Sequence, residues 1–120
     1  MKGEINMPYI NSTLSVKLTE EKKEVIKSKL GEIITEIPGK TEEWLMVSFN
    51  DDQSMYFRGA KKDKAAFVEI KMFGTAERKY KEAITAKVCS LIEEELYITK
   101  DNIYVVFDEI KDWGWNGNMF

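Results

Sequence analysis

The chemistry open to this chain depends first on Met7 and the proline that follows it. Met7 is a second possible translation start, and the initiator methionine is usually removed before a small residue. Pro8 would then carry a free secondary amine. An N-terminal amine titrates near pH ~8 in model peptides, and an apolar pocket or a nearby cation lowers its pKa toward neutrality, where a general base works best. In a Met7–Pro8 amide the same nitrogen has no basicity.

The residues before Met7 can be read as a translated leader. Lys2-Gly3-Glu4 can be encoded as AAA-GGA-GAA, which contains a bacterial ribosome-binding sequence, and Ile5-Asn6 then supply a spacer. This hypothesis assumes a bacterial gene. The alternative is that residues 1–7 are an ordinary polar extension and that Pro8 opens an edge strand, where proline is tolerated. In both cases we expect a domain over residues 8–120, with residues 1–7 outside it.

The amino-acid composition restricts the other chemistry. The chain has no histidine and a single cysteine, which excludes an internal disulfide, a CxxC pair, the usual zinc sites and Ser-His-Asp or Cys-His catalysis. Proton transfer must therefore use a carboxylate, a lysine, a tyrosine or a terminal amine. Cys89 lies among apolar helix positions and is most simply a buried small hydrophobe.

Charge and hydropathy indicate where the protein works. A net charge of −3 and the lack of a Lys/Arg block argue against binding to nucleic acid or a membrane surface. No signal peptide is evident, and no stretch approaches the ~20 apolar residues that a membrane helix needs. We expect a cytoplasmic protein, or one secreted by an unconventional route. Its 120 residues, 43% of them hydrophobic, fit one domain.

The elements that position Pro8 follow from hydrophobic periodicity. The first half predicts a strand over residues 8–14 and a helix that opens at Thr19-Glu20-Glu21 and ends at Pro38-Gly39. Its apolar stripe is Ile26, Leu30, Ile33, Ile34 and Ile37. Next come an apolar strand over 44–49, a turn over 51–53, a short strand over 55–57 and a polar loop over 58–64.

The second half repeats this plan. It predicts a strand over residues 65–73, a helix that starts at Gly74-Thr75, a turn over 99–102 and a strand over 103–107. The expected helical stripe is Tyr80, Ile84, Val88, Leu91 and Ile92. We therefore expect an α/β fold made of two βαβ units in tandem, with a four-stranded mixed sheet and both helices on one face.

The helix-free face of such a sheet requires a cover. Strands 44–49 and 103–107 read as apolar on both sides, which is typical of strands covered on both faces. The chain has no further element to supply that cover. The sequence therefore predicts an oligomer in which sheets of several subunits pack together.

Four motifs, in this order, resemble the macrophage migration inhibitory factor family of the tautomerase superfamily. They are Met7-Pro8, Gly39-Lys40 after the first helix, Asp101-Asn102-Ile103-Tyr104 at the last strand, and the tail from Gly114 to Phe120. The resemblance spans Pro8 to Phe120. It implies a homotrimer with an active site at each subunit boundary, no cofactor and no metal. In that family the N-terminal proline moves a proton between keto and enol forms of phenylpyruvate-like acids, so Pro8 would be the catalytic base.

The resemblance also implies roles for other residues. Lys40 would bind the substrate carboxylate and lower the proton affinity of the amine by like-charge repulsion; the alternative is a solvated lysine at a helix C-terminus. The backbone of Phe73 would line the carboxylate site. Tyr104 would reach in from an adjacent subunit and pack on the substrate ring, and Trp113, Trp115 and Phe120 would close the apolar side. Val106 stands where animal members often have an asparagine, which favours a plain phenyl group.

Three functions remain open at this point. The first is a keto–enol tautomerase acting on aryl 2-keto acids, of the phenylpyruvate or dopachrome type. The second is a non-catalytic interaction protein, like the cytokine role of animal members. The third is a dehalogenase or hydratase of the superfamily, which pairs the proline with arginines. Because the two arginines, Arg58 and Arg78, lie far from Pro8 in sequence, we rank it lowest.

Overall fold

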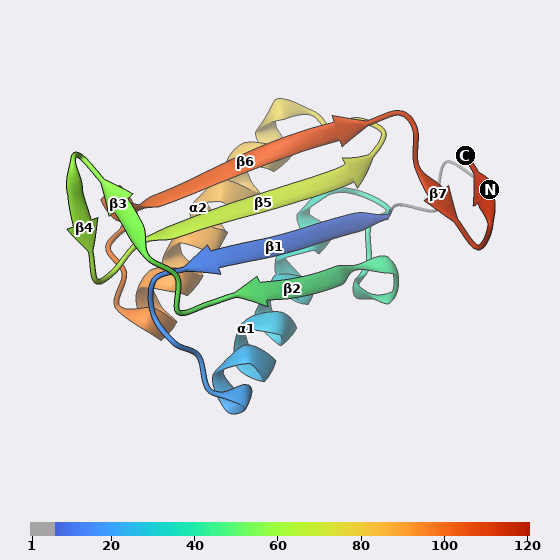
Figure 1. The fold of residues 1–120 in the computed structure, drawn as a ribbon. Helices are drawn as coiled ribbons and strands as arrows, with labels where there is room; N and C mark the ends of the chain where they lie inside the picture. Colours follow the sequence, from blue (N-terminus) through green and yellow to red (C-terminus); the bar gives the residue numbers. More distant parts are fainter. Residues whose placement is uncertain (1–6) are drawn as a thin grey trace.

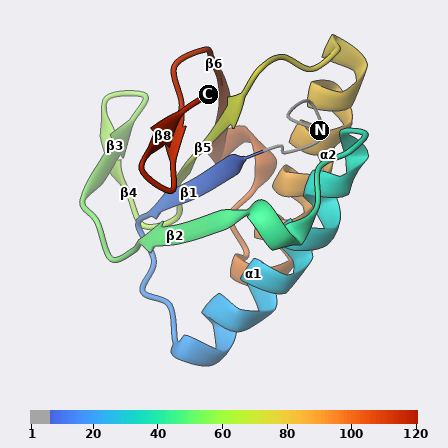
Figure 2. The same ribbon diagram turned by 90° about the vertical axis from the view of Figure 1, so that its right-hand side faces the viewer.

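Two helices lie on one face of a four-stranded mixed sheet in the computed structural model, which describes residues 7–120 (Figure 1 and Figure 2). The strands are β1 (Pro8–Leu14), β2 (Met46–Asn50), β5 (Ala66–Phe73) and β6 (Ile103–Ile110), in the order β2-β1-β5-β6. Residues 1–6, the larger part of the expected leader, lie outside the described residues.

The sheet consists of two parallel strand pairs, which an antiparallel contact joins at its centre. β1 is parallel to β2, β5 is parallel to β6, and β1 and β5 meet antiparallel in the centre. Each parallel pair is connected through a helix: α1 (Glu20–Ile33) in the first half and α2 (Arg78–Leu96) in the second. The predicted tandem βαβ architecture is confirmed.

The first helix begins where the sequence predicts. The Thr19 hydroxyl accepts a hydrogen bond from the Lys22 backbone N–H at 3.1 Å, and Glu20 and Glu21 occupy the first turn. The α-helix ends at Ile33, earlier than the expected Pro38-Gly39. A single 3₁₀ turn over Ile34–Glu36 continues the chain, so Ile34 still packs in the core.

The second helix begins at Arg78, so the expected start at Gly74-Thr75 is wrong. Gly74 adopts φ +87°, which turns the chain out of the strand, and the Ala76 N–H donates to the Glu109 carboxylate at 2.9 Å. This bond holds the connection against β6 before the helix starts. The repeat is therefore inexact: Glu77, not Thr75, is the counterpart of Thr19.

Trp44 does not belong to a strand, although the sequence predicts one over 44–49. It ends a 3₁₀ turn over Glu42–Trp44, closed by a hydrogen bond from the Leu45 N–H to the Glu42 carbonyl at 3.1 Å. β2 therefore starts two residues later, at Met46. This turn directs Trp44 toward the end of the sheet where β1 begins.

Two small hairpins stand at opposite ends of the sheet (Figure 1). The expected polar loop over 58–64 contains a strand, β4 (Ala60–Lys62), which pairs with β3 (Met55–Phe57). At the other end β6 runs three residues beyond the predicted Phe107. A 3₁₀ turn over Lys100–Asn102 precedes β6, and the hairpin β7 (Gly114–Trp115) and β8 (Asn118–Met119) follows it.

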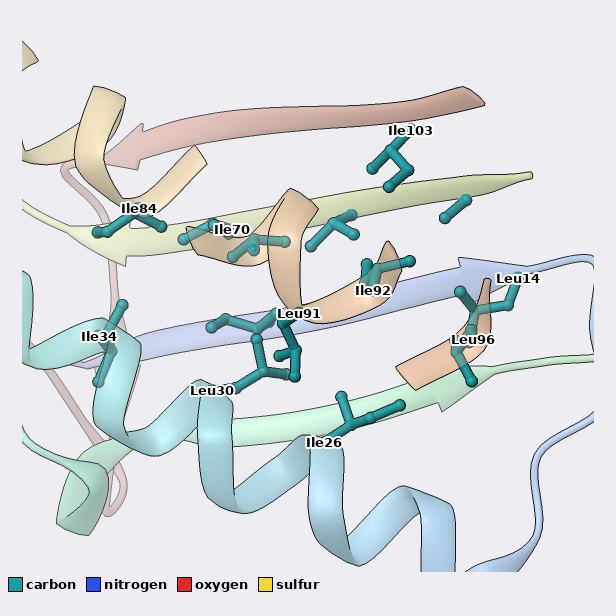
Figure 3. Packing of buried hydrophobic residues seen from close by; sticks show 14 of the residues in the cluster. Leu14, Ile26, Leu30, Ile34, Ile70, Ile84, Leu91, Ile92, Leu96 and Ile103 are labelled. Carbon is teal, nitrogen blue, oxygen red and sulfur yellow. The ribbon is translucent and has the colours of Figure 1, made fainter. Parts of the chain in front are cut away.

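The hydrophobic core fills the space between the sheet and the two helices (Figure 3). Both predicted helical stripes face it, with Ile33 and Tyr80 partly buried at its margin. The fully buried side chains include Ile10, Leu14, Ile26, Leu30, Ile34, Val68, Ile70, Met72, Ile84 and Val88. Within residues 7–120, no helix is long and apolar enough to cross a membrane.

The helix-free face of the sheet is polar at its centre and carries apolar side chains toward its ends. The expectation that strand 44–49 is apolar on both sides holds only in part, because its outward positions in β2 are Met46, which is apolar, and Ser48, which is polar. Ser48 donates to the Asn11 side chain at 2.8 Å, and the Lys71 ammonium lies 2.9 Å from Asp108. The outward residues of β6 up to Val106 are apolar, but the centre of this face is hydrophilic.

The core predicts a large stability cost for a deletion at its centre. Ile10 is fully buried on the internal strand β1, so Ile10→Ala should lower the free energy of unfolding by about 2–5 kcal/mol. Val25→Ala on α1 is the control, because that side chain is 39% exposed; its cost should stay within about 0.5 kcal/mol. Urea denaturation measures both. Equal costs for the two variants would contradict this packing.

Candidate active site

A cleft of about 720 Å³ opens at the end of the sheet where β1 begins. Its walls come from the start of β1, the 3₁₀ turn before β2, the outer face of β5 and the C-terminal hairpin. Figure 1 shows β7 next to this end of the sheet. The lining residues are Met7, Pro8, Tyr9, Glu43, Trp44, Leu45, Met46, Lys71, Trp113, Gly114 and Trp115.

Pro8 is fully buried and is the first residue of β1. The alternative that it opens an edge strand is wrong, because β1 pairs with β2 on one side and β5 on the other. Pro8 itself is paired with Met72 of β5, whereas pairing to β2 starts at Tyr9. A proline is accommodated at the first residue of such a strand, where no ladder donor is lost.

Met7 also lies in this cleft and is 4% exposed. Its carbonyl carbon is bonded to the Pro8 nitrogen, whose lone pair is delocalised into the amide. While this bond is intact, the Pro8 nitrogen at the floor of the cleft is an amide nitrogen and not an amine. Cleavage of this one peptide bond would convert the nitrogen into a base.

Lys40 is 3% exposed and lies between α1 and the 3₁₀ turn that carries Trp44. Its backbone N–H donates to the Ile37 carbonyl at 3.1 Å. Removal of its ammonium from water lowers the pKa of Lys40 to about 8. The alternative of a solvated lysine at a helix end is wrong, but Lys40 is also not among the residues that line the cleft.

A chain of edge-to-face aromatic contacts runs along the cleft. The ring centroids of Phe73 and Phe120 are 5.6 Å apart, those of Phe120 and Trp115 are 6.3 Å apart, and those of Trp115 and Trp44 are 5.1 Å apart. The Phe120 N–H donates to the Trp113 carbonyl at 2.9 Å, which closes the C-terminal hairpin. The structure thus gathers Phe73, Trp113, Trp115 and Phe120 at the Pro8 end of the sheet.

Tyr104 and Val106 lie toward the other end. Through β5, Pro8 is level with Glu109 on β6, and Tyr104 stands five residues earlier. That separation is roughly 17 Å along the strand. The Tyr104 ring instead contacts Phe57 at 5.2 Å, next to a separate apolar pocket of about 220 Å³. A single subunit does not bring Tyr104 to Pro8.

Sequence reasoning missed six residues that line the cleft: Tyr9, Glu43, Trp44, Leu45, Met46 and Lys71. Tyr9 and Lys71 are cross-strand partners, so the register of β1 against β5 would have revealed them. The Tyr9 hydroxyl shares a hydrogen bond of 2.6 Å with Ser48, and the hydrogen bond to Asp108 raises the pKa of Lys71. Trp44 was missed because its turn was predicted as strand.

Comparison with known proteins identifies the fold and the family. Residues 7–120 match the family model described as macrophage migration inhibitory factor (MIF). A Trichinella spiralis homologue of that factor is 28% identical over 116 residues, which cover 95% of this chain and all of the relative.

Solved structures agree. The Leishmania major MIF2 structure superposes with a TM-score of 0.88 at 30% identity, over 95% of this chain and 97% of that one. The homologue from Prochlorococcus marinus gives a TM-score of 0.77 at 30% identity, over 93% and 98% of the two chains.

The buried Lys40 predicts a pH-dependent stability. Its pKa is about 8 in the folded chain, against an ordinary value of 10.5, so between these limits the unfolded chain binds more protons. The penalty for burying the ammonium is full below pH 8 and disappears as the pH rises through this window. The unfolding free energy of the wild type, relative to Lys40→Met, should therefore increase between pH 8 and 10. Paired urea titrations measure this difference; a difference that falls or stays constant would contradict it.

Proposed function

The chain belongs to the macrophage migration inhibitory factor family, and we propose that it is a cofactor-independent keto–enol tautomerase whose general base is the amine of Pro8. The observation that carries this proposal is the position of Pro8, fully buried at the floor of a cleft with tryptophan walls. Its substrates are aryl 2-keto acids, of the phenylpyruvate or dopachrome type. The activity requires release of the Pro8 nitrogen from Met7.

The proposed reaction needs one mobile proton. The neutral Pro8 amine takes a proton from the carbon beside the keto group, and the C–H electron pair forms the enolate. The protonated amine then returns the proton to the enolate oxygen, which gives the enol, and the reverse sequence gives the ketone. No electron acceptor or cofactor enters this balance, and a base with a pKa near the working pH serves both directions.

The surroundings of Pro8 favour its neutral form. Burial among apolar side chains disfavours a charged ammonium, and so does a nearby positive charge. Lys40 is the cation that we assign to this effect and to the substrate carboxylate, with the backbone of Phe73 beside it. Phe73 follows Met72, the cross-strand partner of Pro8, and Lys40 lies in the connection that leads to β2, whose first residue pairs with Tyr9. The pocket thus lowers the proton affinity of the base.

A homotrimer would complete the site. Tyr104 is 56% exposed at the end of the sheet opposite to Pro8, which supports its use by a neighbouring subunit rather than by its own. In that arrangement Tyr104 packs on the substrate ring, while Trp113, Trp115 and Phe120 close the apolar side. Val106 presents no hydrogen-bonding group, so an unsubstituted phenyl ring fits better than a hydroxylated one.

One observation favours a second function. Met7 is buried against Pro8, so the chain can fold with the nitrogen still blocked. A protein that kept residues 1–7 would be a non-catalytic interaction protein with the same architecture. The state of one peptide bond decides between the two functions.

Removal of residues 1–7 should activate the protein. A chain beginning at Pro8 should interconvert enol- and keto-phenylpyruvate at least about 100-fold faster than the chain beginning at Met1, which has no base at this site. Ultraviolet absorbance of the enol measures both rates. Pro8→Gly in the trimmed chain should lose most of the gain, whereas Pro38→Ala, at the other proline, should keep it. Equal rates for the trimmed and untrimmed chains would end the proposal.

A mixing experiment tests whether the site is shared. Trimmed Pro8→Gly and trimmed Tyr104→Ala chains should each be weak, but refolding them together should recover activity. Up to about a quarter of the sites in random mixed trimers would combine an intact Pro8 from one subunit with an intact Tyr104 from its neighbour. Activity equal to the mean of the two separate variants would show that Tyr104 does not serve a neighbouring site.

A further inference from the structure

Trp44 and Trp115 form a corner inside the cleft. Their ring centroids are 5.1 Å apart and their planes meet at 89°, so the edge of one indole meets the face of the other. Trp113 lines the same cleft, and Trp115 is 44% exposed. The face of an indole carries negative electrostatic potential and attracts cations more strongly than other aromatic rings do. A cation beside this edge-to-face pair can contact the exposed indole of Trp115 next to Trp44.

The charged side chains of the cleft also favour a cationic ligand. Glu43 precedes Trp44 on the 3₁₀ turn and lines the cleft; within residues 7–120 its carboxylate has no hydrogen bond or ion pair. The positive charge in the lining, Lys71, is offset because its ammonium lies 2.9 Å from Asp108 and 4.0 Å from Glu69. Among the residues that line the cleft, the unbalanced charge is therefore negative and lies on the tryptophan side.

We propose that this cleft selects a ligand that carries a positively charged amine, held in the corner of Trp44 and Trp115 with Glu43 as its counter-ion. For the 2-keto acid end of the substrate, which reacts, the inference rests on the proposed function. For the cationic end it rests on the cleft alone. The substrate class is a 2-keto acid whose far end bears an ammonium group. A second carboxylate at that end would be repelled by Glu43.

The cationic end can be tested without catalysis. All three tryptophans of the chain line the cleft, so intrinsic fluorescence reports on its occupancy. We would titrate the trimmed protein with benzyltrimethylammonium, benzyl alcohol and benzoate, which share one ring and differ in charge. The cation should bind about fivefold tighter than the alcohol, and benzoate weakest. The preference should shrink at high salt, because the Glu43 contribution is screened.

A matched pair of variants assigns the counter-ion. Glu43→Gln should weaken cation binding about threefold and leave benzyl alcohol unchanged. Glu42→Gln removes the same charge one residue earlier. The Glu42 side chain packs against Gly31 of α1, since a Cβ added to that glycine would lie 2.6 Å from the Glu42 Cδ. This variant should change neither affinity. Equal effects of the two variants, or benzoate binding as tightly as the cation, would overturn the inference.

Kinetics separate this inference from the proposed function. Phenylpyruvate and its 4-trimethylammonio derivative are compared with the trimmed protein, and the charged substrate should show a KM about fivefold lower. Turnover of both substrates with equal KM values and no cation binding would sink the inference and leave the tautomerase intact. Cation binding without turnover of either substrate would support the inference and contradict the proposed tautomerase function.

Discussion

The position of Pro8 at the head of an internal strand is the constraint on which the other features depend. β1 is paired on both sides, and its inward side chains, Ile10 and Leu14, are fully buried in the core. A shift of one residue in its register would turn these side chains out of the core, so the register is strongly fixed. The nitrogen of Pro8 is thereby held at the floor of the cleft. The bond to Met7 then decides whether the same scaffold contains a base or an inert amide.

The polar face of the sheet changes how assembly should be understood. The sequence suggested that apolar faces of several sheets pack together, but the hydrogen bond from Ser48 and the ion pair of Lys71 with Asp108 make the centre of this face hydrophilic. Association of subunits therefore does not follow from a dry apolar face. The stronger argument is the division of the site that we propose, since Pro8 and Tyr104 lie at opposite ends of one sheet. A site that needs both residues needs two subunits.

Much of the fold could be predicted because periodicity and capping agree with the tertiary structure. The Thr19 cap, the alternation in β1 and the stripe around Ile84 all report local rules that packing reinforces. The errors fall at one long-range hydrogen bond and at one local turn inside an apolar segment. Glu109 holds the Ala76 N–H and delays α2, and the turn that moves Trp44 into the cleft looks like strand in an apolar segment. Tyr9 and Lys71 were missed because their proximity to Pro8 depends on register across β1 and β5, which no local pattern encodes.

The central claim is that the cleft makes the released Pro8 amine a better base near neutral pH than the same amine in water. The most direct test is a ¹⁵N NMR titration of the trimmed protein, labelled at proline, against the same chain unfolded in urea. Burial disfavours the protonated amine, and so would the Lys40 cation that we propose acts on it, so the account predicts a lower pKa for Pro8 in the folded protein than in the unfolded chain. A folded-state pKa equal to or above the unfolded value would contradict it.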